Sequence, residues 1–225
     1  MIRFALVTIV AFIFTSAFSQ SSSVDTSKQN AYIRAINQRA DKIVNTLGVS
    51  DSKKALIVRD IIAGQYKNLN DIQTDRDKKI AEVKLQLAND KDAKAAAIKK
   101  LEDAAAARVD SLHAKYVSAL ATRLSSEQVV KVKDGMTYNV LPITYNGYQQ
   151  MILNLTDEQK KQIMAWLVEA REHAMDAETS DKKHAWFGKY KGKINNYLSA
   201  AGIDMNKAGK EWQERIKAQQ TANKN

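Results

Sequence analysis

The sequence predicts an all-α protein, in which a long antiparallel helical hairpin is joined to a C-terminal helical cluster by an irregular, tyrosine-rich crossover. Three observations support this prediction. Apolar residues recur at intervals of three and four over most of the chain, which is the period of a helix with one buried face. The 225 residues include one proline and eight glycines, so few positions break a helix. No strand-like pattern occurs outside residues 133–154.

The start of the chain is expected to be a signal peptide covering residues 1–19. Arg3 supplies a positive charge, an apolar run follows, and the small residues Ala17 and Ser19 suit cleavage before Gln20. The run is shorter than the roughly 20 residues of a membrane-spanning helix. The chain has no cysteine, which excludes disulfides, thiolate metal sites and a lipoprotein anchor. We therefore expect a periplasmic or secreted protein without stable membrane insertion.

A serine-rich, disordered leader is expected over residues 20–26, followed by one helical domain over 27–217. The first helix of that domain has a clean apolar stripe and ends at Gly48, a residue type that often terminates helices. The stripe consists of Ile33, Ile36, Ala40, Ile43 and Leu47.

The long hairpin is expected over about residues 50–123, with its turn at residues 89–92. Each arm has about 35 residues and should be roughly 50 Å long. Heptad-like spacing of the apolar residues is typical of coiled-coil packing. A homo-oligomer formed through the hairpin is a further expectation.

Residues 133–154 interrupt the helical pattern and are expected to form the crossover. This segment holds the only proline, Pro142, together with two glycines and three tyrosines, and no 3.6-residue period runs through it. Tyrosines in an irregular loop can line a groove, or they can fix the loop to the core.

The C-terminal helices are expected over residues 155–217, before a frayed tail at 218–225. Two helix starts carry a hydroxyl residue followed three positions later by glutamine, which is the spacing of a capping box. These pairs are Ser125 with Gln128 and Thr156 with Gln159.

The chain is basic, with 35 Lys and Arg against 25 Asp and Glu, a formal charge of +10. An exported protein has little access to nucleic acid, so we expect no nucleic-acid partner. Acidic polysaccharide, anionic lipid and acidic protein are better candidates. A solvated basic surface without a ligand is the alternative.

The strongest binding candidate is the stretch 182–196, which contains five lysines, three aromatic residues and no acid. On a helix, several of its cations and amides share a face with Trp186. Sugar rings can stack on such an aromatic plane while their hydroxyls bond to amides and ammonium groups. A basic face with a half-buried tryptophan is the alternative interpretation. The candidate ligand-binding residues, including the crossover tyrosines, are Tyr138, Tyr145, Tyr148, His184, Trp186, Lys189, Lys193 and Asn196.

A second cluster consists of Glu169, Arg171, Glu172, His173 and Asp176 and contains two pairs spaced by four residues on one helix, Glu169 with His173 and Glu172 with Asp176. Such pairs could present a carboxylate and an imidazole to one metal ion. The chain has three histidines and no His-Glu-x-x-His pattern. We therefore expect a surface charge network here, with no metal, cofactor or catalytic residue. A polysaccharide-processing enzyme using these carboxylates is the least favoured alternative.

The sequence KDGMTYNVLPITYNGYQQMILNLTDEQKKQIMAWLVEAREHAMD, followed by KKHAWFGKYKGKINNYLSAAGID, resembles a bacterial family of exported domains of unknown function, often described as sugar-binding. The resemblance covers about residues 25–217. It implies an exported helical protein of polysaccharide-degrading Gram-negative bacteria, with no established activity and no ligand residues to transfer.

A second resemblance gives the alternative function. Leu155-Thr156-x-x-Gln159, and the looser Leu124-Ser125-x-x-Gln128, are similar to the Leu-Thr-x-x-Gln motif of small periplasmic helical chaperones. That similarity implies a periplasmic chaperone or adaptor. A capping box accounts for the same residues, and those chaperones lack the crossover segment.

Overall fold

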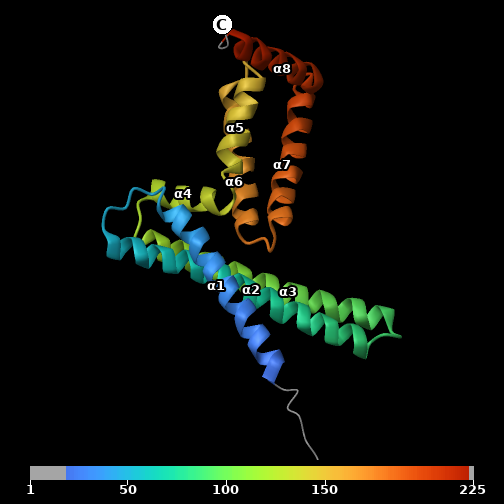
Figure 1. Cartoon of the computed structure of the whole chain (residues 1–225). Coiled ribbons are helices and arrows are strands. Elements are labelled where there is room, and N and C mark those ends of the chain that lie inside the picture. The colour runs from blue at the N-terminus through green and yellow to red at the C-terminus, as the bar shows by residue number, and fades with distance from the viewer. Residues whose placement is uncertain (1–18, 223–225) are drawn as a thin grey trace, which may run out of the picture.

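In the computed structural model, residues 19–222 are described, and all their regular secondary structure is α-helical (Figure 1). The predicted all-α class is confirmed. The expected signal peptide lies outside the described residues, apart from Ser19. Residues 20–26, expected as a disordered leader, instead continue the first helix. The helices are α1 (Ser19–Val44), α2 (Ser52–Gln86), α3 (Lys91–Ala121), α4 (Ser126–Met136), α5 (Val140–Met151), α6 (Asp157–Met175), α7 (Ser180–Ala200) and α8 (Met205–Ala222).

Helices α2 and α3 lie side by side as a long antiparallel pair, and α1 crosses it (Figure 1). Aspartates begin both arms: Asp51 accepts a hydrogen bond from the Lys53 N–H at 2.8 Å, and Asp90 accepts one from the Ala93 N–H at 2.9 Å. Such caps satisfy amide groups that have no partner within the helix. The buried residues of α2 and α3 lie at the end of the pair that contacts the other helices, here called its base. The opposite end, which contains the turn between α2 and α3, extends away from the other helices.

The helices pack around two hydrophobic cores. The first lies among α1, the base of the hairpin and α4, and the second lies among α5, α6, α7 and α8. Met175, at the end of α6, is fully buried in the first core although its helix belongs to the second. This residue and its neighbours therefore fix the C-terminal helices onto the hairpin.

The expected non-helical crossover over residues 133–154 is wrong, because α4 extends into the segment and α5 fills its centre. Pro142 fits as the third residue of α5, where a missing N–H costs no intrahelical hydrogen bond. Only the turns at the ends of α5 are irregular. In the first of them Tyr138 and Asn139 adopt positive φ angles of 58° and 56°.

Both predicted capping boxes are present at the starts of α4 and α6. The Ser125 hydroxyl accepts from the Gln128 N–H at 3.3 Å, and the Gln128 side chain accepts from the Ser125 N–H at 3.1 Å. Thr156 and Gln159 make the same reciprocal pair. Local helix capping thus accounts for the residues that resemble the chaperone motif.

Close packing of α4 on α1 depends on Gly135. A Cβ atom at this position would lie 2.9 Å from Ile43 Cγ1, closer than carbon atoms can approach. We expect Gly135→Ala to lower the free energy of unfolding by about 1–2 kcal/mol, because overpacking outweighs the gain in helix propensity. Gly64→Ala is the control, since nothing lies within 4 Å of its added Cβ, and it should stabilise by about 0.5–1 kcal/mol. Urea denaturation of both variants measures the difference, and equal effects would contradict the packing argument.

Candidate functional site

Two cavities lie where the C-terminal helices meet the hairpin, on either side of the α6–α7 turn. The larger, here called the tyrosine cleft, has a volume of about 850 Å³ and is bounded by α1, α2, α4 and that turn. The smaller, here called the hairpin cavity, has a volume of about 600 Å³ and lies between the hairpin and the facing ends of α6 and α7. Gln73 and Glu178 line both cavities, so the two are neighbours.

The tyrosine cleft gathers positive charge. Arg39 and Lys42 from α1, Lys131 from α4 and Lys183 from α7 all line it. Within the described residues, none of the four forms a salt bridge with a carboxylate. The positive charge of Arg39 lowers the pKa of Lys183, although burial has the larger effect. The cleft therefore carries four basic groups that form no salt bridge in the described part of the chain, although the charge of Asp176 acts on Lys183.

Two acidic residues also line this cleft, and each forms a salt bridge with an arginine that is not one of the four basic residues named above. Asp134 Oδ1 accepts from Arg171 Nη1 at 2.9 Å, and Glu178 Oε1 lies 2.6 Å from Arg76 Nη1. Lys182, which lines the hairpin cavity, also pairs with Glu178. The salt bridges leave the cleft with an excess of cations.

Three tyrosines form the aromatic part of the cleft. The Tyr32 hydroxyl donates to the Tyr66 carbonyl oxygen at 3.0 Å. Burial raises the pKa of Tyr66 to about 12, so its phenol stays neutral. Tyr138 is 48% exposed and stacks on His184, with ring centroids 5.4 Å apart and an interplanar angle of 10°. The left-handed backbone at Tyr138 is unusual for an aromatic residue and places its ring at the edge of the cleft.

Lys183 forms part of the cleft wall, and its side chain caps the C-terminal end of α6. Its Nζ donates to the carbonyl oxygens of Ala174 and Met175 at 2.9 and 2.8 Å. These carbonyls belong to the last turn of α6, where cations interact favourably with the helix dipole. Burial nonetheless lowers the pKa of Lys183 to about 8, with Asp176 acting in the opposite direction.

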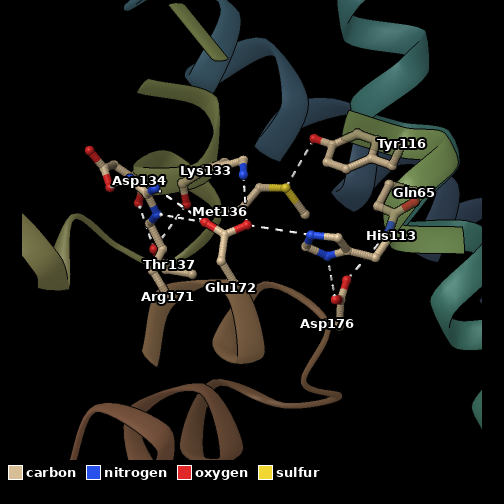
Figure 2. Close-up of polar contacts among 10 residues, drawn as sticks. All are labelled: Gln65, His113, Tyr116, Lys133, Asp134, Met136, Thr137, Arg171, Glu172 and Asp176. Carbon is tan, nitrogen blue, oxygen red and sulfur yellow. Dashed lines mark hydrogen bonds and ion pairs between the residues drawn. The ribbon is translucent and has the colours of Figure 1, made fainter. Parts of the chain in front are cut away.

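A polar network connects α3, α4 and the end of α6 (Figure 2). His113 of α3 bridges two carboxylates of the α6 end: its Nδ1 lies 2.7 Å from Asp176 Oδ2 and its Nε2 lies 3.4 Å from Glu172 Oε2. Hydrogen bonds to Asp176 and Glu172 raise the pKa of His113 to about 9, so the imidazole is positively charged at neutral pH. The Gln65 amide also donates to Asp176, at 3.4 Å.

Further cations meet Glu172 from α4 and from its own helix. Lys133 Nζ donates to Glu172 Oε2 at 2.6 Å, and Arg171 Nη2 lies 3.2 Å from Glu172 Oε1. Burial acts to raise the pKa of Glu172, but hydrogen bonds to His113 and Lys133 outweigh it and lower this pKa to about 2. Since every charged group in the network already has a partner, we interpret it as the structural junction of α3, α4 and α6.

The expectation of a surface charge network is therefore wrong for Glu172 and Asp176. Their side chains are only 29% and 14% exposed, and both contact His113, which comes from a helix far away in the sequence. His173 takes no part in this network, because its ring stacks on Trp186 with a centroid distance of 4.4 Å. In the described part of the chain, no group of three or more His, Asp or Glu residues has the geometry of a metal site.

The eight residues predicted to bind a ligand do not meet in one pocket. Tyr138 lines the tyrosine cleft, with His184 against its ring, whereas Trp186 and Lys189 line the hairpin cavity. The single recognition surface expected from the sequence is therefore divided by the α6–α7 turn.

The other predicted residues lie away from both cavities. Tyr148 is buried and donates to Asn195 Oδ1 at 2.7 Å, while Tyr145 packs against the C-terminal core. Here the alternative interpretation, in which tyrosines fix the segment to the core, holds. Lys193 lies over Trp166 with Nζ 4.6 Å from the ring centroid, and Asn196 is exposed on α7.

Several residues of the tyrosine cleft were missed from the sequence. Arg39 and Lys42 are exposed side chains three residues apart on α1, and Lys131 is an exposed side chain on α4. In the sequence they resemble any solvated helix surface. A possible signal was the spacing of Arg39 and Lys42, which puts both on the same face of α1.

Comparison with known proteins agrees with the resemblance found in the sequence. Among the described helices, none has a stretch apolar and long enough to span a membrane. A search of curated proteins finds no match. The model of the family described as "Protein of unknown function (DUF3826)" matches residues 33–218. That description names no ligand, so sugar binding stays a prediction. The match includes every residue of both hydrophobic cores and both cavities except Tyr32, and the chain therefore belongs to the DUF3826 family.

Proposed function

We propose that this protein binds an acidic carbohydrate in the tyrosine cleft and acts as a binding protein without catalysis. The supporting observation is that four basic side chains without acidic partners line one cavity of about 850 Å³, together with three tyrosine rings. Uronate or sulfate groups would pair with these cations. The volume falls in the range of about 300–1,000 Å³ that is typical of small-ligand sites.

The neutral groups of the cleft favour a sugar over a simple anion. Amides and hydroxyls of Asn70, Gln73, Asn139, Thr179 and Ser180 line the same cavity. Such groups donate and accept hydrogen bonds, as sugar hydroxyls require. Tyrosine rings offer apolar faces for sugar C–H groups and polar tips for their hydroxyls. An inorganic anion would use the cations alone.

Binding is favoured over catalysis because the cleft has no carboxylate placed for proton transfer. Both of its acids, Asp134 and Glu178, are held in salt bridges with arginines. Glycoside hydrolysis generally uses a pair of carboxyl groups flanking the bond to be broken. The export expected from residues 1–19 would place such a binding protein among extracellular or periplasmic polysaccharides.

Removal of two charges from the cleft tests this proposal. In calorimetric titrations with uronate oligosaccharides, Arg39→Gln/Lys42→Gln should weaken binding by at least about tenfold, because two charge-assisted hydrogen bonds are lost. Affinity should also fall as salt is added, since the groups are solvent-accessible.

The control is Lys28→Gln/Arg34→Gln, which removes the same charge from exposed positions of α1 that do not line the cleft. This variant should bind like the unmodified protein. Neutral oligosaccharides of the same length should bind at least about tenfold more weakly than the uronates. Equal binding of neutral and acidic sugars, or no binding by any acidic sugar in the panel, would refute the proposal.

A further inference from the structure

Two lysine ammonium groups lie over aromatic rings on the exposed side of α6 and α7. Lys189 Nζ is 5.0 Å from the centroid of Trp186, and Lys193 Nζ is 4.6 Å from that of Trp166. Both lysines are exposed, and neither forms a salt bridge within residues 27–222. Because they are four residues apart on one helix, their Cα atoms are separated by about 6 Å along its axis.

The aromatic rings beneath these lysines are themselves fixed. Trp186 stacks on His173 with an interplanar angle of 16°, and Trp166 meets Tyr197 edge-on with centroids 5.3 Å apart. A cation–π contact at an exposed site contributes about 0.5–1 kcal/mol. This free energy is enough to restrict the position of the ammonium group. The cation–π contact does not neutralise the positive charge. The result is a strip of positioned charges, here called the lysine–aromatic strip, formed by Trp166, His173, Trp186, Lys189, Lys193 and Tyr197.

The lysine–aromatic strip continues from the cavities at the base of the C-terminal helices. Trp186 and Lys189 line the hairpin cavity, which shares Gln73 and Glu178 with the tyrosine cleft. Four carboxylates also line the hairpin cavity: Glu102, Asp110, Asp176 and Glu178. Glu178 pairs with Arg76, and Asp176 pairs with His113. Glu169 lies on α6 between Trp166 and His173. Burial raises the pKa of Tyr190 to about 12, and Glu169 acts in the same direction. Lys189 thus lies in the wall of the hairpin cavity, and Lys193 continues the positive charge one turn further along α7.

We infer that the lysine–aromatic strip is a second binding surface for the same acidic polysaccharide, used only when the chain is long enough to leave the tyrosine cleft and pass the turn. This inference rests on the proposed function. A polyanion carries charge on successive units and can therefore meet Lys189 and Lys193 in turn, while a single sugar unit held in the cleft reaches neither. Contacts at a second site of one chain raise affinity through effective concentration.

The test compares a uronate disaccharide with a uronate decasaccharide by calorimetry. A longer chain binds more tightly for a statistical reason alone, because it offers more equivalent positions to the site. Beyond this statistical effect, the unmodified protein should bind the decasaccharide at least about tenfold more tightly than the disaccharide. In Lys189→Gln/Lys193→Gln this gain should disappear while disaccharide affinity stays unchanged. The control, Lys191→Gln/Lys210→Gln, removes the same charge from exposed positions of α7 and α8 outside the strip and should keep the gain.

The outcomes separate the two proposals. If Lys189→Gln/Lys193→Gln retains the chain-length gain, the strip plays no part in binding and the inference is wrong. If that variant loses disaccharide affinity as well, the strip is a primary site and the inference is again wrong. If the unmodified protein binds neither oligosaccharide nor any other acidic sugar, the proposed function itself fails.

Discussion

Replacement of Arg171 by leucine is expected to lower the free energy of unfolding by about 4 kcal/mol. The Arg171 side chain is 6% exposed, and its Nη1 lies 2.9 Å from the Asp134 carboxylate, which is 14% exposed. Removing the cation leaves Asp134 charged, largely buried and without its partner, and it also removes one of the cations around Glu172. Breaking one partner of a buried pair typically costs about 3–5 kcal/mol. Urea denaturation measures the loss.

A surface pair provides the matched comparison. Arg59 Nη2 lies 2.7 Å from Asp60 Oδ1, but these side chains are 29% and 65% exposed. Solvent screens such a pair, so Arg59→Leu should change the free energy of unfolding by less than about 1 kcal/mol. Similar losses in the two variants would show that burial of the Arg171–Asp134 pair is not what makes it important.

Asp134 connects this stability prediction to ligand binding. Arg171→Leu/Asp134→Asn removes the unpaired charge and should recover part of the stability lost in Arg171→Leu. In Arg171→Leu alone, the unpaired carboxylate lies in the wall of the tyrosine cleft. There it should reduce the positive potential that the proposed ligand meets. The double variant should therefore also bind acidic sugars better than the single variant does.

The sequence predicts the helices well because their signals are local. The apolar stripe of α1 and the two capping boxes each involve residues within a few positions of one another. The segment 133–154 misled this approach. A proline in the third position of a helix is compatible with the helix, but its presence beside glycines and tyrosines resembles a loop.

The site was harder to predict because its residues meet through tertiary packing. His113 reaches Glu172 and Asp176 only because α6 ends against α3, and no spacing in the sequence encodes that contact. Arg39 of α1 and Lys183 of α7 likewise line the same cleft although they are far apart in the sequence. The prediction of a basic and aromatic surface on α7 identified real clusters at Trp186 and Lys193. It did not show that the α6–α7 turn separates them from Tyr138.

The stability of the protein should depend on pH through His113. The folded state raises the pKa of this imidazole from 6.5 to about 9, by hydrogen bonds to Asp176 and Glu172. A raised folded-state pKa means that the folded protein holds the proton more tightly than the unfolded chain does. The stabilisation is therefore complete below about pH 6.5 and is lost as the pH rises through about 9. We expect it to amount to about 2 kcal/mol, because partial solvent exposure of the ring weakens the effect.

Two other groups also make the stability depend on pH. Lys183 has an effect opposite in sign to that of His113, and Glu172 acts at lower pH. Lys183 has its pKa lowered from 10.5 to about 8, chiefly by burial, so its contribution makes the protein more stable as the pH rises between these values. Glu172, with its pKa lowered from 4.5 to about 2 against the effect of burial, contributes stability above pH 4.5 that is lost as the pH falls through 2. The slope of the unmodified protein alone therefore mixes opposing effects above pH 8.

His113→Gln isolates the imidazole, because glutamine keeps a hydrogen-bonding side chain and does not titrate. Denaturation of both proteins at several pH values between about 5 and 10 gives the difference in their free energies of unfolding. The contribution of Lys183 is common to both and cancels. The advantage of the unmodified protein should be largest near pH 6 and should shrink by about 2 kcal/mol by pH 10. If the difference in free energy of unfolding stays constant over this range, Asp176 and Glu172 do not raise the pKa of His113. The contribution of His113 to the junction would then come from its hydrogen bonds and not from its positive charge.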